Sequence, residues 1–329
     1  MIIGIDLGTT NSLAAYFTED GPRIIPNRLG RHLTPSVVSV DENDQVFVGE
    51  TAKERGFLYP QMTASVFKRD MGSDRKYRLG ARDFTAQDLS SFVLRSLKED
   101  AEAFLQETVE EAVISVPAYF DDKRRKATKR AGELAGLKVE RIISEPTAAA
   151  IAYGLYEKQK NTKFLVFDLG GGTFDVSILE LFENILEVRA VAGDNYLGGE
   201  DFTELLVQHY MDKMGLKLTA LTQKTLGQIR KQAEACKRSY SRAASGTMNC
   251  RIDGEERPLA ITLKEYEKMC EPLLAKIRKP VQRSLSDAHV KLSDIDEIVL
   301  VGGATRLPVV RDFIIRMFKK FPDTAMNPD

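Results

Sequence analysis

The stretch FDLGGGTFDVSIL, residues 167–179, places three consecutive glycines between two aspartates and ahead of a β-branched run. Each glycine costs a folded chain roughly 0.5–1 kcal/mol relative to alanine, so something must require that backbone. The stretch GIDLGTTNSLAAY, residues 4–16, repeats the Asp-Leu-Gly and the small residues after it. The sequence therefore predicts the same unit twice: a buried strand, a Gly-rich turn and a second, antiparallel strand.

The composition of the chain excludes several classes of protein. Its 329 residues, 43% hydrophobic and 29% charged, are enough for about two globular domains. A net charge of −1 predicts no binding to nucleic acid or to an anionic membrane surface. The first residues lack a signal-peptide pattern, and no apolar run approaches the roughly 20 residues of a transmembrane helix. Three cysteines without metal-ligand spacing argue against a zinc site and favour a reducing compartment, the cytoplasm.

Periodic patterns after the two turns predict helices and strands in a similar order in both halves. After the first turn we expect helices over 85–106 and 121–135, buried strands over 112–116 and 139–143, and an Ala-rich helix after Pro146. After the second turn we expect an extended stretch over 185–191, helices near 200–214, 221–241 and 264–288, a strand over 297–301 and a last helix over 308–320. The duplicated plan predicts an α/β fold of two lobes.

The domain boundaries follow from the same duplication. We expect lobe I over residues 1–159, with a small inserted subdomain or long loop at about 38–88. Lobe II is expected over 160–329, with an inserted subdomain of helices and strands at about 198–280. The last residues, MNPD at 326–329, read as a turn before another element, so we expect a chain that continues in the intact protein.

The two Gly-rich turns are candidate phosphate sites. Successive backbone N–H groups in such a turn form a concavity suited to phosphate oxygens, and side chains there would block close approach. The alternative is a tight hairpin chosen for its shape, but the repetition of the turn favours phosphate binding. The pattern G-x-x-x-x-G-K-[ST] is absent, so no P-loop lysine is expected. The candidate residues are Gly8, Thr9 and Thr10 in the first turn and Gly170, Gly171, Gly172 and Thr173 in the second.

Bound phosphates need a counter-charge, which Mg²⁺ usually supplies through few carboxylates and several waters. Asp6 and Asp168 end the two matching strands, so a pseudo-symmetric pair of lobes would bring them to one metal ion. The alternative is that each aspartate caps its own turn. Asp175, seven residues beyond Asp168, is better placed to orient water or a water-bound metal.

Other stretches could complete a nucleotide site. Gly302 and Gly303 follow an apolar strand and precede a helix, which is either a nucleotide contact or a close-packed turn. In EACKRSYS, Glu234, Lys237, Arg238 and Ser241 share one polar helix face that could bind a nucleoside. Spacing alone favours an exposed face with a Glu234–Arg238 pair.

Two further side chains could act on a phosphate. Glu145 precedes a proline-started helix, where it could align water or simply complement the helix dipole. Lys68 could reach a γ-phosphate or lie in solvent. These patterns by themselves predict a two-lobed ATP-binding enzyme and nothing more specific.

Six stretches together resemble the nucleotide-binding domain of the DnaK-type seventy-kilodalton heat-shock chaperone family. They are IGIDLGTTNS, VISVPAYFDDKRRKAT, RIISEPTAAAIAYG, DLGGGTFDVSIL, GDNYLGGEDF and VLVGGATRLP, and they span nearly the whole chain. FKRDMGS, YRLG and LSSFVLRSLKEDAEAFLQ are most similar to its HscC type. The resemblance implies an actin-like ATPase fold with a duplicated ribonuclease H-like core, and ATP or ADP, Mg²⁺ and K⁺ in a cleft between the lobes.

The resemblance also implies roles for individual residues. Lys68 would be required for hydrolysis, and Glu145, Asp175 and Thr173 would surround the attacking water. Asp6 and Asp168 would hold Mg²⁺ through waters, and Pro117 and Arg125 would relay the nucleotide state to a substrate domain. The nucleotide contacts would be Gly8, Thr9, Thr10, Asn11, Gly171, Gly172, Thr173, Gly199, Glu234, Lys237, Arg238, Ser241, Gly302, Gly303 and Arg306.

The family resemblance implies partners as well. These are a J-domain co-chaperone, a nucleotide exchange factor and unfolded client polypeptide, the last bound through a C-terminal peptide-binding domain that is absent here. We expect this chain to be a monomer that hydrolyses ATP slowly and does not bind a client polypeptide. It departs from the family pattern at Ser144, usually Asn in the J-domain contact region, and at Ala304. Two alternatives share the expected fold: a kinase of small substrates and an actin-like filament protein.

Overall fold

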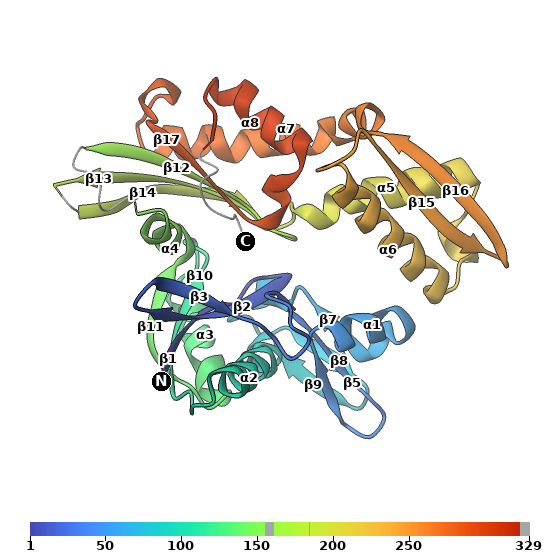
Figure 1. Cartoon of the computed structure of the whole chain (residues 1–329), viewed down its shortest axis with the longest axis horizontal. Coiled ribbons are helices and arrows are strands. Elements are labelled where there is room, and N and C mark those ends of the chain that lie inside the picture. The colour runs from blue at the N-terminus through green and yellow to red at the C-terminus, as the bar shows by residue number, and fades with distance from the viewer. Residues whose placement is uncertain (155–160, 184, 323–329) are drawn as a thin grey trace. The chain divides into compact units, whose positions relative to one another are not determined.

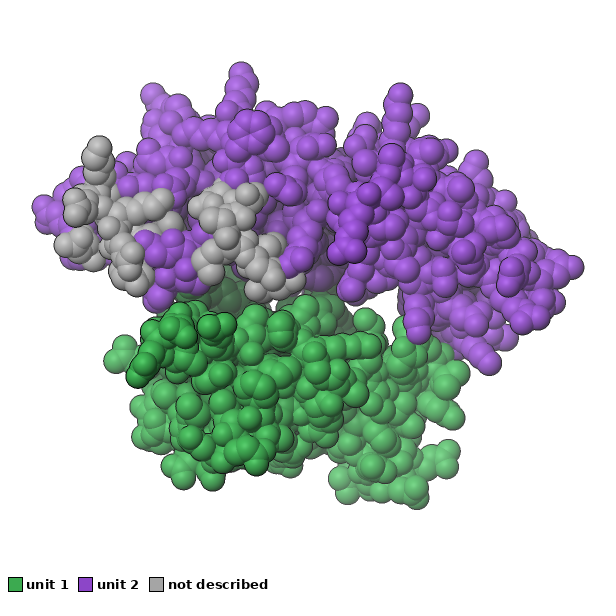
Figure 2. Space-filling model, in the orientation of Figure 1, with its two compact units in different colours: residues 1–148 green, residues 149–329 purple. Residues whose placement is uncertain are grey.

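The computed structural model describes residues 1–154, 161–183 and 185–322, and divides into two compact units. Unit 1 comprises Met1–Ala148 and unit 2 comprises Ala149–Asp329 (Figure 2). The expected change of lobe at residues 159 and 160, and the MNPD turn at 326–329, fall on positions outside the described residues. Each unit is built around its own main sheet.

The main sheet of unit 1 contains the first predicted strand-turn-strand. β1 pairs with β2 in antiparallel and with β10 in parallel, and β10 pairs with β11 in parallel. The strand order is β11-β10-β1-β2-β3, with β4 attached to β2 (Figure 1). The bounds are β1 (Ile2–Asp6), β2 (Asn11–Thr18), β3 (Gly21–Ile25), β4 (Thr34–Pro35), β10 (Glu111–Val116) and β11 (Lys138–Ser144).

The helices of unit 1 confirm the predicted patterns. α2 (Ala86–Leu105) begins with the expected capping box, in which Thr85 and Asp88 bond each other's backbone N–H groups. α3 (Asp122–Leu134) is capped by the Asp121 side chain. Both helices share a core with β1, whose alternate residues Ile3 and Ile5 are buried. α4 (Glu145–Ala152) starts directly after β11, so Glu145 is the first residue of the helix.

The inserted region of unit 1 is more regular than its sequence suggests. It consists of β5 (Val37–Val40), β6 (Val46–Val48), α1 (Glu50–Leu58), η1 (Pro60–Met62), β7 (Thr63–Ser65), η2 (Phe67–Asp70), β8 (Lys76–Leu79) and β9 (Arg82–Thr85). β5 is central in a three-stranded antiparallel sheet, and β8 pairs with β9. Strands of three or four residues are too short to produce a periodic signal. The sequence therefore could not distinguish a small subdomain from a long loop in this region.

The main sheet of unit 2 contains the second strand-turn-strand. Its order is β14-β13-β12-β17, and only the β12–β17 pair is parallel. The bounds are β12 (Thr162–Leu169), β13 (Phe174–Phe182), β14 (Ile185–Asp194) and β17 (Glu297–Val301). α7 (Leu263–Asp287) and α8 (Pro308–Phe318) pack beside this sheet (Figure 1). A short 3-10 turn, η6 (Gly303–Arg306), separates the glycine pair from α8, whereas the sequence predicted a direct entry into the helix.

The second part of unit 2 carries two helices and a hairpin side by side (Figure 1). They are α5 (Gly199–Met214), α6 (Gln223–Ser239), β15 (Ser245–Ile252) and β16 (Glu255–Thr262), with η4 (Leu218–Ala220) after α5 and η5 (Leu292–Asp294) after α7. The hairpin turns at Asp253 and Gly254, which both have positive φ, as a two-residue Asp-Gly turn requires.

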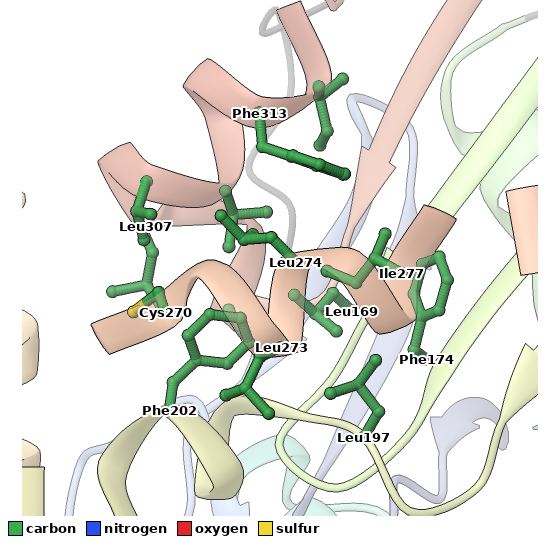
Figure 3. Close-up of a cluster of buried hydrophobic side chains, with 14 of the residues drawn as sticks. Leu169, Phe174, Leu197, Phe202, Cys270, Leu273, Leu274, Ile277, Leu307 and Phe313 are labelled. Carbon is green, nitrogen blue, oxygen red and sulfur yellow. The ribbon is translucent and has the colours of Figure 1, made fainter. Parts of the chain in front are cut away.

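One continuous core joins the two parts of unit 2. Leu169 and Phe174, from the strands on either side of the glycine turn, pack in the same cluster as Phe202 of α5 and Leu274 of α7 (Figure 3). The Tyr266 hydroxyl donates to the Phe202 carbonyl at 3.0 Å. The start of α5 is thereby fixed to the core next to the glycine turn.

The three cysteines lie in the interior of the structure. Cys236, Cys250 and Cys270 are buried free thiols, and no cluster of metal-binding side chains occurs in the described ranges. Among the same residues, no helix is both long and apolar enough to cross a bilayer.

Candidate functional site

In unit 1, Asp6 ends β1 at the first glycine turn. The Ser115 hydroxyl, on the neighbouring strand β10, donates to Asp6 Oδ1 at 2.7 Å. Ser115 lies opposite Asp6 in the parallel register, so the sheet itself aligns the two side chains. Asp6 therefore has one oriented oxygen at the end of a buried strand, as a metal-binding carboxylate requires.

The first turn is closed by its own backbone and by Ser36. A Cβ atom at Gly8 would overlap the carbonyl oxygen of Asn11, so this position of the turn has no room for a side chain. The Ser36 hydroxyl donates to the Gly8 carbonyl at 2.7 Å, and the Ser36 N–H donates to the Thr10 carbonyl at 2.8 Å. Thr10 Oγ1 is buried without a hydrogen-bond partner among the described residues. A buried hydroxyl of this kind suits a polar ligand.

Lys68 and Glu145 form a buried ion pair in unit 1. Lys68 Nζ lies 2.8 Å from Glu145 Oε1, and the Lys68 side chain is 4% exposed. Val66, directly before η2, has a φ of 50°, a left-handed conformation that is costly for a β-branched residue. The chain therefore accepts strain at the start of the turn that holds Lys68 inside.

Burial outweighs the ion pair in setting the protonation of Glu145. Burial raises the pKa of the Glu145 carboxyl above its ordinary value, a shift that nearby Asp6 reinforces and Lys68 opposes. A carboxylate with a raised pKa is a stronger proton acceptor, which suits a group that aligns and activates water. The resemblance implied this role for Glu145, and no contact that the structure describes opposes it.

The predicted relay residues lie next to this pair. The Pro117 carbonyl accepts the Phe120 N–H at 3.1 Å, and the Arg125 guanidinium donates to the Phe120 carbonyl at 2.9 Å. Lys68 Nζ lies 5.8 Å from the centre of the Phe120 ring. Phe120 therefore connects Pro117 and Arg125 with Lys68, a connection that the sequence pattern did not contain.

In unit 2, the second turn is tied to the start of α5. The Gly170 N–H donates to the Thr173 carbonyl at 3.0 Å, and the Gly199 N–H donates to the Gly170 carbonyl at 2.9 Å. A Cβ atom at Gly198 would lie 2.5 Å from Gly172 N and 2.6 Å from the Gly171 carbonyl oxygen. Two backbones meet here so closely that only glycine fits.

The two aspartates of this turn face each other across the hairpin. Asp168 on β12 is opposite Asp175 on β13. Gly193 lies so close to Asp175 that a Cβ atom at Gly193 would overlap Asp175 Oδ1. Gly302 has a φ of 86°, and a Cβ atom there would lie 2.8 Å from Asp168 Oδ1. Gly193 on β14 and Gly302 directly after β17 thus allow the backbone to approach both carboxylates closely.

The residues after Gly302 divide between the interior and the surface. The Thr305 hydroxyl caps this turn by donating to the Gly302 carbonyl at 2.7 Å. Gly303 and Arg306 in η6 are exposed.

The predicted nucleoside residues share one face of α6, but their environments differ. Glu234 Oε1 accepts from Arg238 Nε at 2.8 Å, which confirms the expected pair. Lys237 is buried, with its side chain 10% exposed, whereas the Arg238 side chain is 74% exposed. The Ser241 hydroxyl donates to the Arg238 carbonyl. The wholly exposed face that spacing favours is therefore wrong at Lys237.

The charge of Glu234 is strongly stabilised. Burial would raise its pKa, but Lys237, Thr203 and Arg238 outweigh burial and lower the pKa from 4.5 to about 2. Glu234 is therefore ionised at every pH at which the fold is expected to function.

This shift gives a pH-dependent prediction. Because the folded-state pKa is lowered, ionised Glu234 stabilises the fold above pH 4.5 and loses that contribution as the pH falls towards 2, by roughly 3 kcal/mol in all. Glu234→Gln should therefore be less stable than the wild type at pH 6, with a difference that shrinks towards pH 2.5. Urea unfolding of both proteins across this range measures it. A difference that stays constant with pH would contradict the assignment.

The structure brings the site residues together as two sets, one in each unit. Unit 1 groups Lys68 with Glu145, and unit 2 joins the second turn to Gly199 and α6. The sequence did not point to Ser36, Ser115 or Thr203, which hold these groups. Only Ser115 had a usable signal, since it lies on a predicted strand in register with Asp6.

The chain is similar over its whole length to known proteins. A family model described as Hsp70 protein matches residues 2–329. The chaperone protein DnaK of Thermotoga petrophila is 44% identical over 340 residues, covering 100% of this chain and 57% of the relative. DnaK of Thermotoga neapolitana matches to the same extent, and DnaK of Thermosipho africanus is 43% identical over 339 residues, covering 100% and 56%. This chain spans a little over half the length of these relatives.

Proposed function

The chain belongs to the Hsp70 protein family, and on that premise we propose that it binds ATP and hydrolyses it slowly to ADP and phosphate. The observation that carries this proposal is the buried Lys68–Glu145 pair. A lysine held inside a unit by a carboxylate with a raised pKa is a costly arrangement that stability alone does not explain.

We assign phosphate binding to the two glycine turns. Gly8, Thr9, Thr10 and Asn11 would contact phosphate oxygens from one turn, and Gly171, Gly172 and Thr173 from the other. Thr10 Oγ1 and the tight backbone at Gly8 support the first assignment, and the close backbone contact at Gly198 supports the second. Gly302, Gly303 and Arg306 would contact the nucleotide next to the second turn.

Asp6 and Asp168 would hold Mg²⁺ through waters, since each lies at or next to the end of a strand beside a Gly-rich turn. The oriented oxygen of Asp6 fits such a role. When bound, the ion supplies positive charge to the phosphate oxygens. K⁺ is proposed as an additional ion of the same site.

The proposed hydrolysis step uses the side chains that the family resemblance implies. Water attacks the γ-phosphorus in line, the bond to the bridging oxygen breaks, and ADP leaves. Glu145, Asp175 and Thr173 orient the water, and Glu145 accepts its proton. Lys68 places positive charge beside the transferred group, which lowers the barrier through positioning and electrostatics.

The nucleoside is assigned to α6. Glu234, Lys237, Arg238 and Ser241, with Gly199 of α5, would recognise the adenosine. The exposed guanidinium of Arg238 is able to stack on a base. We further propose that Pro117 and Arg125 report the nucleotide state to partners through Phe120, whose backbone both residues bond.

The partners of the intact protein remain part of the proposal. They are a J-domain co-chaperone, a nucleotide exchange factor and unfolded polypeptide, with the cytoplasm as the compartment. The relatives are named chaperones, and this chain covers 57% of their length.

Single-turnover hydrolysis of γ-labelled ATP tests the proposed function. With Mg²⁺ present, we expect labelled inorganic phosphate in solution, no labelled small-molecule product, and no increase in light scattering. Phosphate transfer to an added sugar or carboxylate would support the kinase alternative, and ATP-dependent scattering would support a filament. If ATP is neither bound nor cleaved, the proposal is wrong.

A further inference from the structure

Thr203 on α5 lies at the centre of a buried polar network in unit 2. Thr203 is 4% exposed, and its hydroxyl oxygen lies 2.7 Å from Glu234 Oε2 and 3.1 Å from the Gly199 carbonyl oxygen. Lys237 Nζ donates to the same hydroxyl at 2.7 Å. A hydroxyl has one hydrogen to donate, so the shorter contact indicates donation to Glu234 while it accepts from Lys237.

The network uses the whole donor capacity of Lys237. An ammonium group has three N–H donors. Their acceptors are the Gly199 carbonyl oxygen at 2.8 Å, Thr203 Oγ1 at 2.7 Å and Glu234 Oε2 at 2.6 Å. With each donor satisfied inside unit 2, Lys237 holds Gly199, Thr203 and Glu234 in place.

Glu234 keeps capacity for one further donor. A carboxylate offers about four acceptor positions. Lys237 and Thr203 occupy Oε2, and Arg238 Nε occupies one position on Oε1. The remaining position on Oε1 belongs to a side chain that is partly exposed, so a hydroxyl group of a ligand can reach it.

The same network is attached to the phosphate turn. The Gly199 N–H donates to the Gly170 carbonyl at 2.9 Å, and the Gly199 carbonyl accepts from Lys237 Nζ at 2.8 Å, with the Thr203 hydroxyl oxygen 3.1 Å away. Phe202, beside Thr203, is fixed in the core. Thr203 therefore sits on a rigid element and sets the position of Glu234 relative to the turn.

We infer that Thr203 is a positioning residue for nucleotide recognition, whose hydroxyl aims the free Oε1 position of Glu234 at a sugar hydroxyl of the nucleotide. This inference rests on the proposed ATP-binding function. Thr203→Val removes the hydroxyl and keeps a β-branched side chain of nearly the same volume. Thr203→Ser keeps the hydroxyl.

The test compares the binding of ADP and of 2′,3′-dideoxy-ADP by titration calorimetry. Thr203→Val should bind ADP about tenfold more weakly than the wild type, as expected for a lost hydrogen bond to a charged group. Its affinity for the dideoxy nucleotide should be unchanged, since that ligand has no sugar hydroxyl for Glu234. Thr203→Ser should restore ADP binding. Ser284→Ala, which removes a buried hydroxyl on α7 in the same unit, should leave both affinities as they are.

The outcomes separate the inference from the function on which it rests. Equal weakening of both nucleotides in Thr203→Val, or unchanged binding of both, would overturn the positioning role. Absence of ADP binding in the wild type would overturn the proposed function instead. If Thr203→Val does not fold, Thr203→Ala removes the same hydroxyl without the second methyl group and decides between the same outcomes.

Discussion

Replacing Lys68 by alanine is expected to lower the single-turnover rate of ATP hydrolysis by at least about a hundredfold while ADP binds nearly as in the wild type. The reason is that Lys68 lies in a buried pair with Glu145 in unit 1, where its charge acts on the transferred phosphate more than on the bound nucleotide. Rapid-quench hydrolysis and ADP titration measure the two effects. Equal loss of binding and hydrolysis would show that Lys68 is a binding residue.

Loss of stability could imitate this result, because the variant leaves Glu145 buried without its lysine. The double variant Lys68→Ala with Glu145→Gln removes that orphaned charge. We expect it to unfold at a higher temperature than Lys68→Ala, yet to remain inactive. Lys53→Ala, at an exposed position on α1 of the same unit, should retain both activity and stability. Recovery of hydrolysis in the double variant would argue against a catalytic role for Lys68.

Replacing Gly302 by alanine is expected to destabilise unit 2 by roughly 3 kcal/mol or more and to abolish tight nucleotide binding. Gly302 has a φ of 86°, and a Cβ atom there would overlap the Leu169 carbonyl and lie 2.8 Å from Asp168 Oδ1. Neither backbone can move without disturbing the strand that ends at Asp168. Urea unfolding and ADP titration measure the two losses.

Gly254 provides a matched control for the conformational part of this cost. It has the same φ of 86°, but no atom lies within 4 Å of a Cβ placed there. Gly254→Ala should therefore cost only the left-handed backbone penalty, about 1–2 kcal/mol, and leave nucleotide binding intact. Equal losses in the two variants would mean that crowding at Asp168 contributes nothing.

Much of the fold could be predicted because its signals are local. The capping pattern at Thr85 and Asp88 located the start of α2, and apolar periodicity located the other long helices. The strands around both glycine turns were predicted in the same way, and their antiparallel pairing is confirmed. The small sheets of the inserted regions were not placed strand by strand, because their pairing depends on partners distant in the sequence.

The site was predictable as a set of residue types rather than as a geometry. Glycine turns, their aspartates and the polar face of α6 follow from sequence patterns. The burial of individual side chains does not follow from these patterns. The sequence allowed Lys68 to lie in solvent, and the spacing along the helix placed Lys237 on an exposed face. Thr203 and Ser115 carry no motif of their own.

By itself, the sequence determined the duplicated strand-turn-strand plan and the chemistry available at each turn, because propensity, periodicity and glycine requirements act over a few residues. Tertiary structure alone decided that Lys68 meets Glu145 across 77 positions and that Thr203 joins Lys237 across 34. Such contacts depend on which elements pack together and in what register. In this protein, packing buries the charge of Lys68, which the sequence alone would allow to lie in solvent. Packing also places the Thr203 hydroxyl against the Glu234 carboxylate.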